Sequence, residues 1–163
     1  MRLMTIGDPR QRSTVASIVL LAVASLLLLP RPAGAQADVH VVWSHETAKY
    51  KFIDLGNPGI RMGDRLDARG PLLDATRTNE VGNAYLDCIA MSGITAPVGG
   101  LYRCSYVLHL ADGDLVVEGL DPHGPGVFTM AVLGGTGAFA RAVGEATLTD
   151  TATETDFSID LTG

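Results

Sequence analysis

After residue 38, apolar and polar residues alternate along most of the chain, a pattern that predicts β-strands. A first strand starts at Val39 and places Trp43 and His45 on one face and Glu46 on the other. The last strand, over residues 157–161, alternates in the same way. No segment in this part of the chain keeps a helical apolar period over three turns, so we expect an all-β protein.

The clearest local signal is the dipeptide Asp112-Gly113, which stands between two alternating runs and predicts a tight β-hairpin. With these two residues at the turn, Leu110 faces Leu115, and one face of the hairpin becomes apolar. We expect that face to point into the core; it carries Tyr102, Cys104, Tyr106, Leu108, Leu110, Leu115 and Val117.

Further strands are expected between turn signals rich in Gly, Pro and Asn. They run over Gly63 to Leu73, Ala84 to Met91, Val127 to Leu133 and Arg141 to Thr149. The turn signals are Asn57-Pro58-Gly59, the loop 92–100 and the run Gly134-Gly135-Thr136-Gly137. The segment 127–133 is apolar throughout and predicts a buried strand. Short strands at this spacing are typical of a sandwich or an up-and-down barrel, and barrel closure removes the exposed edges.

Residues 1–35 have the features of a secretory signal peptide. Arg2, Arg10 and Arg12 precede an uncharged apolar run of about 15 residues, which is short for a bilayer span of roughly 20. Small residues allow cleavage after Ala35 or Ala37. We therefore expect a secreted or extracytoplasmic protein whose barrel domain covers residues 38–163, with an uncleaved N-terminal anchor as the alternative.

The charge of the chain changes when the leader is left out. Of 12 Lys and Arg residues, four lie in residues 1–35, as does one of 18 Asp and Glu residues, which leaves 8 basic and 17 acidic side chains and a net charge of −9. Such a chain repels a phosphate backbone and has little attraction for anionic lipid. We expect no nucleic-acid partner and no stable membrane span after processing.

Both cysteines, Cys88 and Cys104, belong to the predicted mature part. In an oxidising compartment an even number of cysteines usually means pairing, so we expect a disulfide, with two separate buried thiols as the alternative. The four histidines show no metal-binding spacing, and two cysteines without further ligands make a poor zinc site. No metal is expected.

Residues 135–140 match the dinucleotide-binding pattern G-x-G-x-x-A. The 23 residues after Ala140 are too few for the βαβαβ unit that such a site needs, and they alternate as strands. The glycines are better explained by a sharp turn between strands. Asp54, Asn57 and Asp64 do not have the spacing of an EF-hand loop, and no G-x-S-x-G motif presents a nucleophile.

Several of these positions together resemble the allene oxide cyclase/dirigent superfamily. They are Gly63-Asp64, Val81-Gly82, Cys88, Gly119 and the segment GGTGAFARAVGE over residues 134–145. The resemblance covers the chain from about Gly63 to its end. It implies an eight-stranded antiparallel up-and-down barrel that holds a lipophilic ligand and steers its cyclisation or coupling, often as a trimer.

Of four positions in the allene oxide cyclase pattern, the chain clearly matches one and departs at three. Cys88 matches the family's cavity cysteine, but the expected Asn falls on Gly70, and the expected Tyr falls in residues 121–125, which contain none. The family's Glu corresponds to Glu46 only with gaps. True allene oxide cyclase activity is therefore not expected, and stereoselective phenol coupling is not supported by the second strand.

The expected function is steering of the cyclisation or isomerisation of a small lipophilic substrate, without a cofactor. Holding a flexible substrate in a reactive conformer needs little acid–base chemistry. Trp43, Tyr102 and Tyr106 are the candidate ligand-binding residues, and His45 and Glu46 are the candidate proton-transfer residues. The alternative is a non-catalytic secreted barrel that carries a lipophilic molecule or is packed solid. A homo-oligomer, dimer or trimer, is expected from the resemblance alone.

Overall fold

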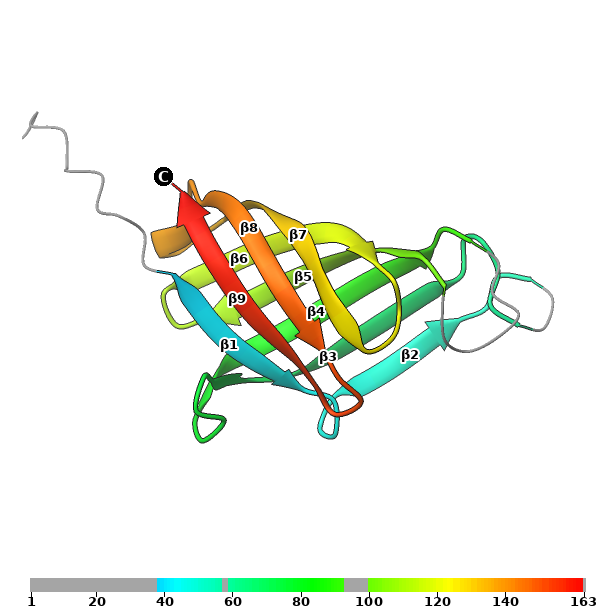
Figure 1. Cartoon of the computed structure of the whole chain (residues 1–163), viewed down its shortest axis with the longest axis horizontal. Coiled ribbons are helices and arrows are strands. Elements are labelled where there is room, and N and C mark those ends of the chain that lie inside the picture. Colours follow the sequence, from blue (N-terminus) through cyan, green and yellow to red (C-terminus); the bar gives the residue numbers. More distant parts are fainter. Residues whose placement is uncertain (1–37, 57–58, 93–99, 163) are drawn as a thin grey trace, which may run out of the picture. The chain divides into compact units, whose positions relative to one another are not determined.

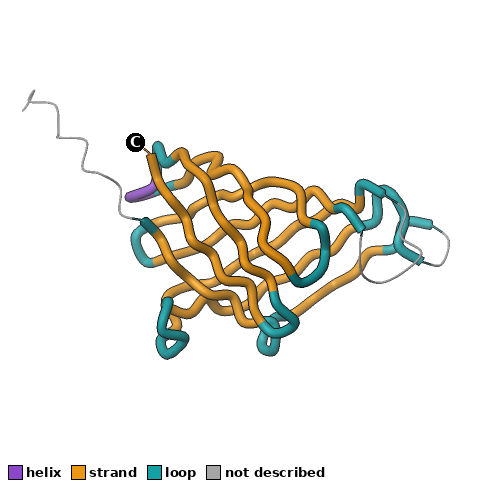
Figure 2. The backbone as a smooth tube through the Cα atoms, viewed as in Figure 1, coloured by secondary structure: helices purple, strands orange, loops and turns teal. Residues whose placement is uncertain are grey.

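The computed structural model describes residues 38–56, 59–92 and 100–162, and these form an antiparallel β-barrel (Figures 1 and 2). The predicted leader and its cleavage sites lie outside the described residues, as do Asn57, Pro58 and most of the loop 92–100. The only helical element in the described part is the short 3₁₀ turn η1 (Gly137–Phe139). The strands are β1 (Val39–Ser44), β2 (Lys49–Ile53), β3 (Arg65–Asp74), β4 (Glu80–Ala90), β5 (Tyr102–Leu110), β6 (Gly113–Asp121), β7 (Gly126–Gly135), β8 (Val143–Asp150) and β9 (Glu154–Thr162).

The barrel closes through β1, which pairs with β9 on one side and with β3 on the other. β1 pairs with residues 72–74 of β3, and β2 pairs with residues 65–69 of the same strand. β1 and β2 therefore occupy successive stretches of one strand position. The nine strands fill eight positions of an up-and-down barrel, and the expected fold class is confirmed.

The β5–β6 hairpin has the expected faces with a shifted register. Leu110 pairs with Gly113 and Leu108 with Leu115, so the turn residues are Ala111 and Asp112. The shift from the expected pairing is two residues. Because strand faces repeat every two residues, the predicted inward set is still buried, with Leu110 partly buried against the core.

The expectation of a buried strand over residues 127–133 was wrong for half of its side chains. Met130 and Val132 are buried in the barrel, whereas Val127 and Leu133 are more than half exposed. A strand of this barrel has one face inside and one outside, so an apolar run is not enough to bury both faces.

The glycine-rich segment after β7 covers one end of the barrel, which we call the base. The Thr136 and Ala138 N–H groups donate to the carbonyls of Asp114 and Asp112 in the β5–β6 hairpin, and Phe139 is buried against the core. A Cβ atom on Gly137 would lie 2.3 Å from the Asp112 carbonyl oxygen. The glycines therefore permit the sharp turn between β7 and β8 that the sequence predicted, and also a close backbone approach to the hairpin.

Cys88 on β4 and Cys104 on β5 lie directly opposite each other and form a disulfide. Both half-cystines are almost fully buried on the inner face. The expected disulfide is thus present, and the alternative of two separate thiols is not.

Candidate functional site

A cavity of about 310 Å³ opens at the end of the barrel opposite the base. We call it the mouth cavity. It lies where the loops after β1, β6 and β8 meet the inward faces of β3, β4 and β5. Its lining consists of Trp43, His45, Tyr50, Leu66, Leu86, Cys88, Tyr106, Asp121, His123, Gly124, Pro125, Asp150, Thr151, Ala152 and Thr155.

The break between β1 and β2 creates this opening. β1 ends at Ser44, residues 45–48 turn away, and β2 then continues along β3 without pairing with β9. In Figure 1, β2 lies apart from β9 on this side of the barrel. The turn brings His45 and Tyr50 to the rim.

Aromatic rings form one wall of the mouth cavity. The Trp43 ring lies 6.0 Å from the Tyr50 ring and 6.1 Å from the Tyr106 ring, centroid to centroid, and the second contact is edge to face. Tyr106 packs edge to face on Phe157 at 5.2 Å. These contacts fix the ring orientations, so the wall is preformed.

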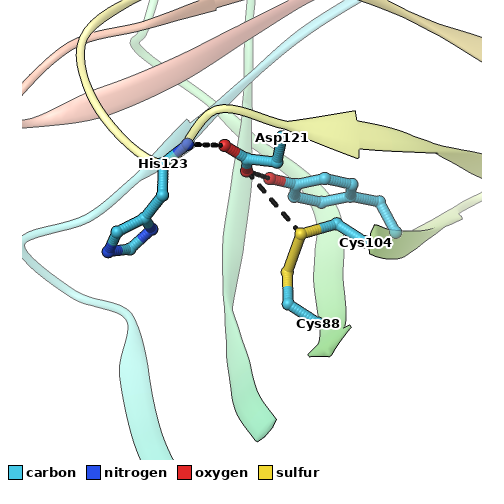
Figure 3. Close-up of a disulfide and its surroundings, with 5 residues drawn as sticks. Cys88, Cys104, Asp121 and His123 are labelled. Atoms are coloured by element: carbon cyan, nitrogen blue, oxygen red, sulfur yellow. Dashed lines mark hydrogen bonds between the residues drawn. A yellow bond between two sulfur atoms is a disulfide. The ribbon is translucent and has the colours of Figure 1, made fainter. Parts of the chain in front are cut away.

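Asp121, at the end of β6, is a buried carboxylate on the floor of the cavity (Figure 3). Its Oδ1 accepts the backbone N–H of His123 at 2.6 Å, and its Oδ2 accepts the Tyr106 hydroxyl at 3.3 Å. Oδ2 also lies 3.7 Å from Cys104 Sγ; a disulfide sulfur carries no hydrogen, so this is a contact without a proton. Burial, followed by the charge of Asp121, raises the pKa of Tyr106 well above its usual value, so Tyr106 remains a neutral donor.

Asp150, at the end of β8, is the second carboxylate of the cavity. The Thr155 hydroxyl donates to Asp150 Oδ1 at 2.7 Å, and His45 Nε2 lies 2.8 Å from the same hydroxyl oxygen. An ionised carboxylate only accepts, so Thr155 gives its proton to Asp150 and accepts one from His45 Nε2–H. Burial raises the pKa of Asp150 above its ordinary value, and the negative charge of Asp121 adds to the rise.

The predicted site residues separate into two groups. Trp43, His45 and Tyr106 line the mouth cavity together. Tyr102 is buried but outside the lining, and its ring packs on His123 at 4.8 Å. Glu46 is exposed and also outside the lining, because β1 ends at Ser44 and the strand alternation used to place it stops there.

Sequence reasoning missed Tyr50, Asp121, His123, Asp150 and Thr155. The run Lys49-Tyr50-Lys51-Phe52 alternates, which was a usable signal for β2. Asp121 and Asp150 follow strands, a place where turns commonly use Asp, so local pattern alone does not separate them from ordinary turn residues.

One group of residues has the composition of a metal site without its chemistry. Ligand atoms of Cys88, Cys104 and Asp121 lie within 4.8 Å of one another. Metal binding by cysteine needs the thiolate, and both sulfurs are used by the disulfide. The arrangement can instead bind a small organic molecule against an aromatic wall and exchange a proton with it through a carboxylate of raised pKa.

No protein-family model and no curated protein matches the chain. Among solved structures, a pyocyanin demethylase shares 27% identity over 77% of this chain and 100% of that protein, with a TM-score of 0.64. The pterocarpan synthase dirigent protein PsPTS1 shares 16% identity over 76% of this chain and 92% of its own, with a TM-score of 0.59. The Diels-Alderase AbmU from Streptomyces koyangensis shares 12% identity over 97% and 84%, with a TM-score of 0.56.

The last two likenesses concern the fold alone. The strand order of this chain and the three structures agree with the barrel fold that the resemblance over residues 63–145 implies. The chain therefore has the barrel fold of these proteins, which is the fold that the resemblance to the allene oxide cyclase/dirigent superfamily implies.

Proposed function

We propose that the protein binds one small, largely apolar organic molecule in the mouth cavity and catalyses its isomerisation or cyclisation. The observation that supports this most directly is Asp150, a carboxylate of raised pKa beside an aromatic wall in a cavity of about 310 Å³. A volume of this size is at the lower end of the range for small-molecule sites, so the substrate is small.

In this proposal the aromatic wall of Trp43, Tyr50 and Tyr106 holds the substrate in one conformer, which lowers the entropic part of the barrier. Asp150 takes a proton from one atom of the substrate, and the same proton returns to another atom of the product. The hydroxyl oxygen of Tyr106, whose proton is donated to Asp121 Oδ2, accepts a hydrogen bond from the substrate and orients it. The reaction is neutral in mass and uses no external oxidant or reductant.

Thr155 and His45 position the base. The Thr155 hydroxyl orients Asp150 Oδ1, and His45 orients the hydroxyl. A raised carboxylate pKa brings the base closer to neutral pH, where proton transfer is most effective.

Export of the protein belongs to the same proposal. Disulfides form and persist in oxidising compartments, and Cys88 and Cys104 form one here. Among the described residues, no helix is long and apolar enough to cross a bilayer. A homo-oligomer remains a prediction.

The test is deuterium incorporation. The protein as its host produces it is analysed by native mass spectrometry for a bound small molecule, which is then incubated with the protein in D₂O. We expect a product of unchanged composition that carries deuterium at a carbon position. Asp150→Asn should still bind the molecule but lose the exchange by about 100-fold or more, as expected for loss of a general base.

Asp160→Asn is the matched control, because Asp160 is exposed on β9 and the change removes the same charge. Binding without any product or exchange would contradict catalysis and favour the alternative of a carrier barrel. Absence of any bound molecule, together with no binding of the neutral dye 1-N-phenylnaphthylamine or of pyocyanin, would contradict both readings.

A further inference from the structure

The permanently charged side chains of the mouth cavity lining are all acidic, and its two titratable basic side chains are His45 and His123. Two carboxylates, Asp121 and Asp150, line it, and no Lys or Arg does. Lys49 and Lys51 are near in sequence, but they alternate with Tyr50 along β2 and therefore point to the other face of that strand.

Neither carboxylate has the arginine partner that acids elsewhere on the barrel have, although His45 Nε2 lies 3.5 Å from Asp150 Oδ1. On the outer surface, Asp87 pairs with Arg65, and Glu154 pairs with Arg77. Among the described residues, Asp121 has hydrogen bonds from neutral groups only, although it is 8% exposed. A buried charge without a partner is costly, so this carboxylate is a feature that a bound cation would stabilise.

The aromatic wall of the mouth cavity also favours a bound cation. Trp43, Tyr50 and Tyr106 line the cavity, and the faces of aromatic rings attract organic cations. Carboxylates that face aromatic rings across a small cavity form the usual environment for a nitrogen cation.

We infer that the ligand of the mouth cavity is a small organic cation, a conjugated ring system with a positively charged nitrogen. This inference rests on the proposed function, because it names the substrate class of the same cavity. The ring stacks against Trp43, and the positive nitrogen lies toward Asp121 and Asp150. Carboxylate and phosphate ligands are disfavoured because no Lys or Arg lines the cavity to neutralise them, while Asp121 and Asp150 repel them.

The test compares three ligands of similar shape and different charge by isothermal titration calorimetry on the protein as its host produces it. They are N-methylquinolinium, 1-naphthalenemethanol and 1-naphthoate. We expect the cation to bind about tenfold more tightly than the neutral compound and the anion to bind most weakly. Quenching of Trp43, the only tryptophan of the chain, reports whether each ligand occupies the cavity.

Two variants separate local from global charge. Asp150→Asn should reduce the preference for the cation over the neutral compound at least threefold, and Asp160→Asn, which changes the net charge equally, should leave it unchanged. Equal loss in both variants would show that overall charge causes the preference and would overturn the inference.

The remaining outcomes distinguish this inference from the proposed function. Tighter binding of the neutral or anionic compound, with quenching of Trp43, overturns the cation and leaves a small-molecule barrel in place. No binding of any of the three overturns the inference and also counts against the proposed function.

Discussion

At the scale of single residues, the surroundings shift the pKa values of two aspartates, Asp150 and Asp74, in opposite directions, although both end a strand. Asp150 is partly buried in the mouth cavity, and burial raises its pKa. Asp74 ends β3 beside an exposed turn, and hydrogen bonds from Asn79, Thr78 and Thr76 lower its pKa. The two therefore contribute to stability with opposite dependence on pH.

We predict that Asp150→Asn makes the protein more stable at neutral pH. A raised folded-state pKa means that the ionised group opposes folding, so its contribution to stability is complete at acid pH and is lost as pH rises through the folded pKa. The Asn oxygen can still accept the Thr155 hydroxyl. Thermal unfolding should show the gain at pH 7 and its disappearance below about pH 4, near the ordinary Asp value; a variant less stable at pH 7 would refute the argument.

Gly70 on β3 gives space to the buried indole of Trp43. A Cβ atom there would lie 2.8 Å from Trp43 Nε1 and 3.0 Å from Ala48 Cα. Gly70→Ala should therefore destabilise the protein by about 1–3 kcal/mol and shift the fluorescence of Trp43, as measured by urea unfolding. Gly126→Ala is the control, because its nearest neighbouring atom is 4.0 Å away. Equal midpoints for the two variants would contradict the proposed steric role.

At the scale of elements, the β4–β5 pair connects the disulfide to the site. The two strands are in continuous register from Gly82–Leu110 to Ala90–Tyr102, and Cys88–Cys104 is one of their pairs. Cys88 lines the cavity, and Cys104 contacts the Asp121 carboxylate. The disulfide thus connects the two strands at the wall of the mouth cavity.

Replacing both cysteines by alanine should lower the free energy of unfolding by about 3 kcal/mol, the value expected for a loop of this length. The bond closes a loop with a sequence separation of 16 residues. Urea unfolding of the double variant and of the reduced wild-type protein should give similar midpoints. A wild-type mass that does not rise by two hydrogen atoms on reduction would mean that the bond is absent.

At the scale of the whole molecule, the barrel depends on its first strand. β1 completes the sheet by pairing with β9 over residues 39–44 and with β3 over residues 41–43. Without it, both neighbouring strands would present unpaired backbone groups, which promotes association between chains.

We predict that a chain beginning at His45 forms large aggregates, whereas a chain beginning at Asp38 gives a single defined species. Analytical ultracentrifugation distinguishes the two results and also measures the oligomeric state of the longer chain. A well-behaved species from the shorter chain would show that β1 is not required for closure.

Local sequence was sufficient for much of the fold. Alternation put Val41 and Trp43 on one face of the first strand, and the structure shows that this face is buried. The inner face of the hairpin was predicted correctly despite a two-residue error in register, because faces repeat every two residues. The apolar run 127–133 was misread, because composition alone does not tell whether the outer face of a strand meets solvent. The strand β2 was missed, because it is short, exposed and follows directly on a turn.

The sequence by itself determined a chain of antiparallel strands, because alternation depends only on neighbours along the chain. It also predicted a disulfide from the even number of cysteines and a barrel from the resemblance, and three of its candidate ligand-binding and proton-transfer residues line the mouth cavity. Only the tertiary structure decided that Asp121 and Asp150 line one cavity together with Tyr50, His45 and Tyr106. Barrel closure brings the ends of distant strands together, and burial there changes the proton affinity of a group that looks like an ordinary turn residue in the sequence.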